Sequence, residues 1–404
     1  MATLSSATTT TATTTPTPTY KLQLASGAGP VYRDVLQTPA RDCYPSEVPV
    51  IDLARINGNA EERAALAKVI RAAAENTGFF YITNHGIPEE KITAAYNQVT
   101  KFFNQPVEEK AKVAHSQSKH FNGWSKRGTA HISPTEPRDH KEGFTIAYDP
   151  KYDPDTKDLA AVPEDIKPWI HGEDFVWEGT SHLPGFKDDV LGYWQAQVRL
   201  ARRMIRLFAL ALDVPEDYFD SITSYPGRFV DLICAFSATQ HLRRYPATNM
   251  KYSDGVFNYY PASEPDESGK IDVGIGAHTD IQAFTLLWQD TVGGLQVLTK
   301  DGQWVKVQPI PGTFVVNIGD FLMRLSNDRF QSTVHRVYNH ATVDRISMPL
   351  FFGFNFNEKC SVLPTCCDEN NPPKYEPISC GEVCHPHAPK RRPLLYWEWE
   401  MSDA

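Results

Sequence analysis

The sequence predicts an α+β protein whose core is mainly β, arranged as a sandwich or a barrel. Two observations support this prediction. In the first part of the chain, segments with apolar residues at helical spacing alternate with short β-rich runs. From residue 229 onward, short β-rich runs of even spacing alternate with turns marked by Gly, Pro and Asn-Asp, which is typical of a sandwich or barrel.

The first part of the chain is expected to hold a tail, two short strands and three helices. Residues 1–19 are mostly Thr, Ser, Ala and Pro without a charged side chain, so they cannot bury enough apolar surface to offset their chain entropy. The Asp-, Pro- and Lys-rich stretch 149–190 reads as surface loops. The expected strands are 48–53 and 78–82, and the expected helices are 60–77, 88–103 and 190–212.

The second part of the chain is expected to be almost entirely β. Residues 248–274 form a long, polar stretch marked by Pro and Gly, and we interpret it as a loop inserted between strands. The expected strands that follow are 281–287, 294–298, 304–307, 313–318, 333–338 and 348–355.

Composition excludes several classes of function. The chain has 404 residues, of which 41% are hydrophobic and 22% charged, so disorder over its whole length is excluded. A formal charge of −9 does not favour a nucleic-acid partner. No apolar run approaches the length of a transmembrane helix, so no membrane partner is expected. The seven cysteines and the absence of a signal-peptide pattern lead us to expect a cytoplasmic location.

The sharpest local feature is the tripeptide His278-Thr279-Asp280. In an extended strand, residues i and i+2 point to the same face, so an imidazole and a carboxylate lie side by side. The best candidate for a third ligand is His335, in a strand-like run 57 residues further on. Two His and one carboxylate on one face of a metal are typical of non-haem Fe(II) oxygenases. Zinc is a less natural occupant, because it favours four-coordinate sites and does no redox chemistry.

A second pair of polar residues follows in Arg345-Ile346-Ser347. Here too the i and i+2 side chains share one face of a strand. A buried guanidinium takes two oxygens of a carboxylate, and the neighbouring hydroxyl adds a further donor. The pair therefore predicts a site for a carboxylate.

With these motifs in order, the chain resembles the isopenicillin N synthase-like family of Fe(II)- and 2-oxoglutarate-dependent dioxygenases. Within that family the sequence looks most like fungal members. The resemblance covers roughly residues 45–360. It rests on the stretches 48–52, 76–88, 276–280, 293–297, 316–320, 326–328, 332–336 and 345–347.

The resemblance implies a double-stranded β-helix (jelly roll) with flanking helices. It implies that His278, Asp280 and His335 bind Fe(II), and that Arg345 and Ser347 hold the distal carboxylate of the cosubstrate 2-oxoglutarate. The implied co-reactant is O₂, with ascorbate as an optional support. The implied reaction is hydroxylation, desaturation or ring formation on a small organic molecule, in secondary-metabolite biosynthesis, with no catalytic residue beyond the iron ligands.

The family usually adds a tyrosine to the 2-oxoglutarate site, and two candidates compete for this role. Tyr245 keeps a spacing often seen in fungal members, although Arg243 stands where Asn or Leu is common. Tyr260 keeps the literal Asn-x-Tyr-Pro motif and lies closer to His278. We favour Tyr245, which leaves 248–274 as an extra loop near the mouth of the site.

Two alternatives stay open. One is an Fe(II) oxidase or cyclase of the isopenicillin N synthase type, which needs no 2-oxoglutarate and uses its Arg-x-Ser on its own substrate. The other is a zinc hydrolase or a cupin-like binding protein. The cysteines and histidines after residue 359 match no familiar zinc finger, so free thiols or an irregular loop are expected there.

The expected organisation is one catalytic domain with extensions at both ends. The expected parts are a disordered tail and lead-in (1–44), an N-terminal α+β region (45–225), the jelly-roll core (226–360) and a C-terminal extension (361–404).

Overall fold

The fold is described from a computed structural model of the chain. The described residues are 17–24, 31–156, 158–226, 255–265, 272–340, 342–355 and 357–379. The helices are α1 (Ala60–Asn76), α2 (Glu89–Phe103), α3 (Val107–Ala111), α4 (Phe175–Gly179), α5 (Phe186–Ala211) and α6 (Asp320–Leu325). None of these described helices is both long and apolar enough to cross a membrane.

Two sheets form the centre of the protein. The larger sheet has eight strands in the order β4-β5-β13-β10-β15-β8-β7-β6, and most of its neighbouring strands are antiparallel. Its strands are β4 (Val50–Asp52), β5 (Phe79–Thr83), β13 (Phe314–Ile318), β10 (Phe284–Gln289), β15 (Arg345–Phe352), β8 (Gly255–Tyr260), β7 (Glu142–Ile146) and β6 (Gly123–Ser125).

The smaller sheet has five strands in the order β3-β12-β11-β14-β9, so β9 is an edge strand. An apolar core joins the two sheets, with Tyr81 and Val315 on the larger and Val297 and Val337 on the smaller. This arrangement is the predicted jelly roll. The strands of the smaller sheet are β3 (Arg41–Asp42), β12 (Trp304–Lys306), β11 (Leu295–Leu298), β14 (His335–Tyr338) and β9 (Val273–His278).

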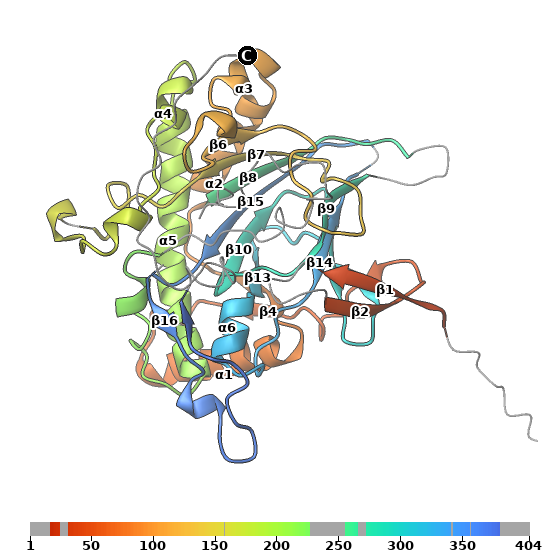
Figure 1. The fold of residues 1–404 in the computed structure, drawn as a ribbon, viewed down its shortest axis with the longest axis vertical. Coiled ribbons are helices and arrows are strands. Elements are labelled where there is room, and N and C mark those ends of the chain that lie inside the picture. Colours follow the sequence, from red (N-terminus) through yellow and green to blue (C-terminus); the bar gives the residue numbers. More distant parts are fainter. Residues whose placement is uncertain are drawn as a thin grey trace, which may run out of the picture.

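Helices cover the outer face of the larger sheet. The long helix α5 runs along this sheet (Figure 1), and its apolar side joins α1, α2 and the sheet in one buried cluster. At the start of α1, Asn59 and Glu62 form a capping box, which satisfies amide groups that the first helical turn leaves free. The helices therefore support the sheet from outside and leave its inner face for the site.

Strands are present in residues 17–24 and 31–44, where a disordered lead-in was expected. Strands β1 (Thr19–Leu24) and β2 (Val31–Leu36) form an antiparallel hairpin. Leu22, Leu24 and Val35 are buried in a small apolar cluster with Trp304 of β12. In Figure 1 this hairpin lies beside β14. The low apolar content of residues 1–19 hid the apolar alternation that begins directly after them.

The interpretation of 248–274 as an inserted loop is wrong for its centre. Residues Gly255–Tyr260 form β8, which pairs with both β7 and β15 inside the larger sheet. Phe257 packs into the outer core and Tyr260 into the inner one, which is the alternation of a strand buried on both faces. Polar residues on either side of this short run obscured the signal. The short elements β6, β7 and α6 were also not predicted.

Candidate functional site

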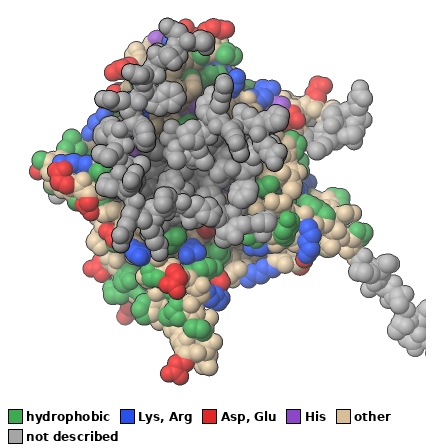
Figure 2. Space-filling model, viewed as in Figure 1, with side chains coloured by type: hydrophobic (Ala, Val, Ile, Leu, Met, Phe, Trp, Pro, Cys, Tyr) green, Lys and Arg blue, Asp and Glu red, His purple; other side chains and the backbone are tan. Residues whose placement is uncertain are grey.

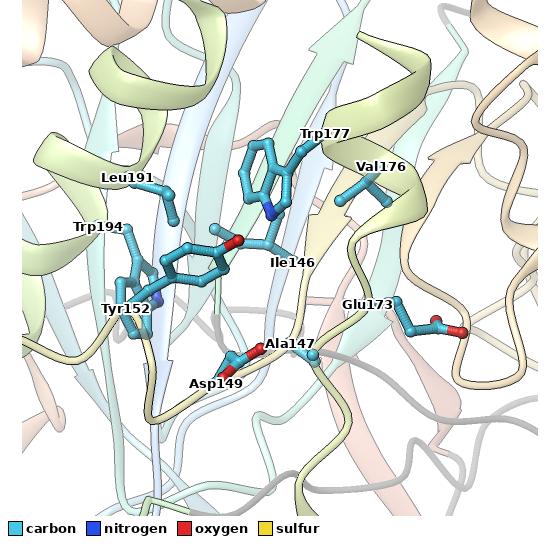
Figure 3. Close-up of a pocket in the computed structure, with 10 residues that line it drawn as sticks. Ile146, Ala147, Asp149, Tyr152, Glu173, Val176, Trp177, Leu191 and Trp194 are labelled. Atoms are coloured by element: carbon cyan, nitrogen blue, oxygen red, sulfur yellow. The ribbon is translucent and has the colours of Figure 1, made fainter. Parts of the chain in front are cut away.

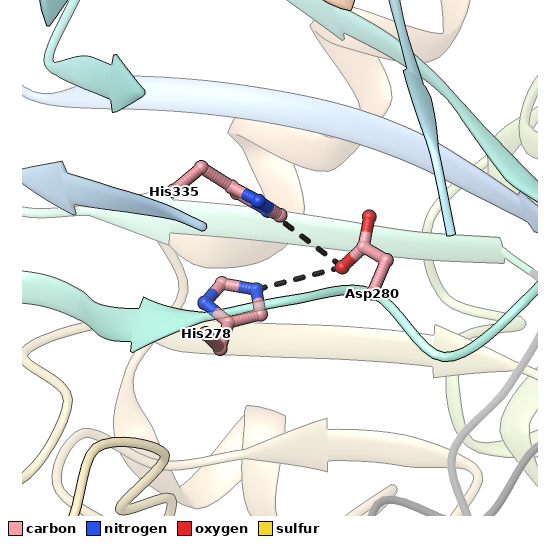
Figure 4. A group of neighbouring side chains, drawn as sticks. All are labelled: His278, Asp280 and His335. Carbon is pink, nitrogen blue, oxygen red and sulfur yellow. Dashed lines mark ion pairs between the residues drawn. The ribbon is translucent and has the colours of Figure 1, made fainter. Parts of the chain in front are cut away.

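Three potential metal ligands meet between β9 and β14. His278 is the last residue of β9, Asp280 follows two residues later, and His335 opens β14. The strands are antiparallel and pair His335 directly with His278. One ligand atom from each of the three residues lies within 4.8 Å of the others (Figure 4). Asp280 Oδ1 is 3.5 Å from His278 Nε2 and 3.7 Å from His335 Nε2.

Backbone carbonyls orient both imidazoles. Nδ1 of His278 lies 2.8 Å from the Gly276 carbonyl oxygen, and Nδ1 of His335 lies 3.1 Å from the Thr333 carbonyl oxygen. A carbonyl only accepts, so each Nδ1 carries the proton and each Nε2 presents its lone pair. Both lone pairs are therefore available on the side of Asp280.

The carboxylate of Asp280 is held by two donors from neighbouring strands. Its Oδ2 accepts hydrogen bonds from Thr285 Oγ1 of β10 and Asn317 Nδ2 of β13, both at 2.6 Å. These bonds occupy one oxygen and leave Oδ1 facing the two imidazoles. Supporting hydrogen bonds of this kind orient metal ligands.

The charges of the three groups suit a divalent cation. Burial works against ionisation of Asp280, but His335, His278 and the Thr285 hydroxyl outweigh it and hold the pKa of this carboxyl below its ordinary value. Burial and the nearby His278 lower the pKa of His335 to about 4. A carboxylate and a neutral imidazole are thus ready to bind metal at neutral pH without losing a proton. Two nitrogen donors and one oxygen donor on one side fit Fe(II).

Within the described part of the chain, this is the group of three or more His, Cys, Asp or Glu residues that could hold a metal ion. Cys360, Cys366 and Cys367 are free thiols and form no such group there. The remaining C-terminal cysteines and histidines, from Cys380 onward, lie outside the described residues.

Arg345 lies at the start of β15 with an incomplete set of partners. Its side chain is 1% exposed, and its Nη2 donates to Gln289 Oε1 at 2.9 Å. Its Nε and Nη1 are buried without a hydrogen-bond partner among the described residues. A buried charged donor left unpaired is costly, and an anion at this position would satisfy both nitrogens. Ser347, two residues on, is equally buried on the same face.

The structure brings Tyr260 to this guanidinium. Tyr260 is paired directly with Arg345 across β8 and β15, and the guanidinium lies 4.7 Å from the centre of its ring. Burial raises the pKa of Tyr260, which keeps its hydroxyl protonated as a donor. Tyr245, which we favoured, lies outside the described residues. The position of Tyr260 supports the literal Asn-x-Tyr-Pro motif as a candidate, and the prediction for Tyr245 stays a prediction.

The sequence pattern did not single out Thr285, Asn317 or Gln289, although each supports a predicted site residue. Each is a polar residue within an otherwise apolar strand. That exception to the apolar pattern is the signal that could have identified them, because a buried polar side chain needs a partner.

A small hollow lies away from these residues, between Trp177 and Leu191 on the helical side and Ile146 on β7 (Figure 3). Its volume is about 10 Å³. That is room for about one water molecule and not for an organic substrate. On the described part of the face in Figure 2, acidic and basic side chains are interspersed.

Comparisons with known proteins agree with this geometry. Residues 48–166 match the family described as non-haem dioxygenase in morphine synthesis N-terminal, and residues 253–354 match the 2OG-Fe(II) oxygenase superfamily. These two matches together cover more than half of the chain.

Two fungal relatives extend the likeness over most of the chain. A 2-oxoglutarate-Fe(II) type oxidoreductase, ppzC, from Metarhizium rileyi is 42% identical over 361 residues, which are 89% of this chain and 91% of the relative. A 2-oxoglutarate-Fe(II) type oxidoreductase, hxnY, from Emericella nidulans is 32% identical over 343 residues, which are 84% of this chain and 88% of the relative.

Solved structures show the same fold. A full-length Neurospora crassa protein crystallised with alpha-KG and thymine superposes with a TM-score of 0.62 at 26% identity, covering 83% of this chain and 95% of that one. A 2OG-Fe(II) oxygenase family protein from Caulobacter crescentus gives a TM-score of 0.64 at 25% identity, covering 84% and 97%.

Proposed function

Because the chain belongs to the 2OG-Fe(II) oxygenase superfamily, and so is an oxidoreductase that uses Fe(II), 2-oxoglutarate and O₂, we propose which residues do this work and on what class of substrate. His278, Asp280 and His335 hold the iron. Arg345, Ser347 and Tyr260 hold the far carboxylate of 2-oxoglutarate. The substrate is a small organic molecule of secondary metabolism, which is hydroxylated, desaturated or closed into a ring.

The main support for this assignment is that one jelly roll holds both a group of metal-ligand atoms and a buried guanidinium, and that each of these needs a further ligand to be complete. Three ligand atoms converge within 4.8 Å, and none of them is blocked by a proton. On the inner face of the larger sheet, a buried guanidinium keeps two nitrogens without a partner. A dicarboxylate that reaches a metal at one end and a guanidinium at the other satisfies both.

The residues of the chain then have separate tasks. With iron and 2-oxoglutarate bound, the site would use O₂ as the oxidant that attacks a C–H bond of the substrate, and 2-oxoglutarate would be the electron donor. Arg345 offers Nε–H and Nη1–H to the far carboxylate, and the hydroxyls of Ser347 and Tyr260 add neutral donors. Thr285 and Asn317 keep the free oxygen of Asp280 turned to the iron. Because Thr285 and Asn317 are buried, bulk water is kept from the hydrogen bonds that they donate to Asp280, and these bonds are stronger as a result.

The 2-oxoglutarate-independent oxidase is the less favoured alternative, because two relatives at 42% and 43% identity are named 2-oxoglutarate-Fe(II) type oxidoreductases. A cytoplasmic location completes the proposal. It is supported by the free thiols of Cys43, Cys360, Cys366 and Cys367 among the described residues, which suit a reducing compartment.

The test is an anaerobic titration of the full chain with Fe(II) and 2-oxoglutarate, followed by a screen of small molecules under air. We expect a visible charge-transfer band that needs both additions, and succinate formed in step with the oxidised product. Product formed without succinate would favour the independent oxidase. Failure of the band to form with wild-type protein would contradict the proposed site.

A further inference from the structure

The loop between β6 and β7, residues 126–141, lies against the strand that ends in His278. Because β9 is an edge strand, its outer side would otherwise leave backbone groups unpaired. The loop satisfies several of them. His140 N donates to the Val273 carbonyl at 2.9 Å, and Gly276 N donates to Asp139 Oδ1 at 3.2 Å.

One loop residue, Glu136, contacts the neighbours of both histidine ligands. Its Oε2 accepts a hydrogen bond from the backbone N–H of Ala277 at 2.5 Å, and its Oε1 lies 3.7 Å from Nη1 of Arg336. Ala277 directly precedes His278, and Arg336 directly follows His335. A single carboxylate therefore ties β9 to β14 next to the point where their two imidazoles must share one ion.

The partner of Glu136 is itself held firmly in place. The guanidinium of Arg336 stacks 3.8 Å from the centre of the Trp304 ring, and its Nε and Nη2 donate to Gln296 Oε1 at 3.1 and 3.0 Å. The side chains of Arg336 and Glu136 are only 12% and 13% exposed, so water screens their attraction weakly. The ion pair thus fixes Glu136 against a rigid support.

Gly276 allows the loop to come this close. A Cβ atom at this position would lie 2.6 Å from Ser133 Cβ and 3.2 Å from Glu136 Oε2. Gly276 lies two residues before His278, where the pairing of β9 with β14 is irregular. The loop is therefore packed directly against the part of β9 that leads into the ligand.

We infer that Glu136 is a positioning residue for the metal centre, which holds the strands of His278 and His335 at the spacing that one ion requires. This inference rests on the proposed iron site. Residues that support metal ligands typically contribute about 10- to 100-fold to metal affinity. Glu136 acts on the two histidine ligands of the metal indirectly, through the backbone of β9 and the side chain of Arg336, and not through the imidazoles themselves.

The test measures the affinity of the metal-free full chain for Mn(II) by calorimetry, which needs no turnover. Glu136→Ala removes both contacts, and we expect it to weaken Mn(II) binding about 10- to 100-fold. Glu136→Gln keeps an oxygen for Ala277 N–H but loses the charge that faces Arg336. Arg336→Met loses the same ion pair from the other side. The control is Arg138→Ala in the same loop, where an exposed side chain contacts the Gly128 carbonyl at 3.4 Å.

Coupling between the two partners is the decisive readout. If the ion pair acts on the metal centre, the double variant Glu136→Gln/Arg336→Met binds Mn(II) no more weakly than whichever single variant has the lower Mn(II) affinity. If the losses in Mn(II) affinity of the two single variants add up in the double variant to within about twofold, the inference is overturned. This outcome does not depend on whether Glu136→Ala folds. So would a Glu136→Ala protein that unfolds at the wild-type temperature and binds Mn(II) with wild-type affinity.

The same titration separates this inference from the proposed function. Wild-type protein that binds no Mn(II), or a His278→Ala variant that binds it as the wild type does, would overturn the iron site and the inference with it. Wild-type binding that is lost in His278→Ala but unchanged in Glu136→Ala would overturn the inference alone.

Discussion

His278 and His335 face each other as a directly paired position of two antiparallel strands, and their ring centres lie 4.2 Å apart. The pairing of β9 with β14 therefore sets the distance between the two imidazoles. A slip of one residue in this register would turn His335 to the opposite face of its strand. The metal centre depends on sheet register as much as on the identity of its ligands.

The first prediction concerns the charge of Asp280. In Asp280→Asn the amide keeps the shape and loses the charge that offsets a divalent cation. We expect Fe(II) affinity to fall beyond the range of about 10- to 100-fold that is typical of a residue that only supports a ligand. Calorimetry on the metal-free protein and succinate release under air measure the effect. Asp301→Asn, in an exposed turn, is the control, and wild-type succinate release by Asp280→Asn would contradict the assignment.

The second prediction concerns the unpaired guanidinium of Arg345. In Arg345→Met, 2-oxoglutarate affinity should fall by about 10- to 100-fold, because charge-assisted hydrogen bonds are lost. The free energy of unfolding of the unliganded protein should stay level or rise, because a buried charge with two unsatisfied nitrogens is removed.

Thermal unfolding with and without 2-oxoglutarate measures both effects of this substitution. Arg55→Met, at an exposed ion pair with Glu62, is the control. An unliganded Arg345→Met protein that is strongly destabilised would mean that Arg345 serves the fold and not the cosubstrate.

The third prediction decides between the two tyrosines. Tyr260→Phe removes a hydroxyl beside Arg345, and we expect about tenfold weaker 2-oxoglutarate binding, since one hydrogen bond to a charged group is lost. Tyr245→Phe should leave the affinity unchanged. The two dissociation constants, measured under the same anaerobic conditions, are the readout. The reverse pattern would assign the role to Tyr245.

The fourth prediction concerns the stability of the metal-free protein below neutral pH. The pKa of His335 is lowered to about 4 by burial and His278, whereas an unfolded histidine titrates near 6.5. The unfolded state therefore binds a proton first as the pH falls from about 6.5 to about 4. His335 thus costs stability across this window, by up to about 3 kcal/mol at its lower end.

Asp320 acts in the opposite direction, so a variant is needed to isolate His335. Burial raises the pKa of Asp320 to about 6, and its contribution to stability is present at low pH and lost as the pH rises. His335→Gln removes the histidine contribution and also a group that helps to hold the pKa of Asp280 low. Both changes act in the same direction, so its stability should decline less than that of the wild type between pH 6.5 and 4. Urea unfolding at a series of pH values measures this difference. His340→Gln, at an exposed position, should follow the wild type.

Much of the fold and of the candidate site could be predicted from local patterns. The helical period over residues 60–77 predicts α1, and His278-Thr279-Asp280 predicts two neighbouring ligands, although Asp280 lies just beyond the end of β9. The roles of Asn317 and Gln289 could not be predicted in this way. Asn317 lies 37 residues from Asp280, and Gln289 lies 56 residues from Arg345, so their contacts depend on which strands become neighbours.

The N-terminal hairpin has a practical consequence for shortening this protein. Its apolar cluster includes Ala277 and Val334, the residues directly before the two histidines. A chain cut at residue 45, where the sequence suggests a domain boundary, would remove Leu22, Leu24 and Val35 from this cluster. A chain cut at residue 17 would keep all three. The first deletion would therefore take apolar packing away from the two strands that carry the proposed metal ligands.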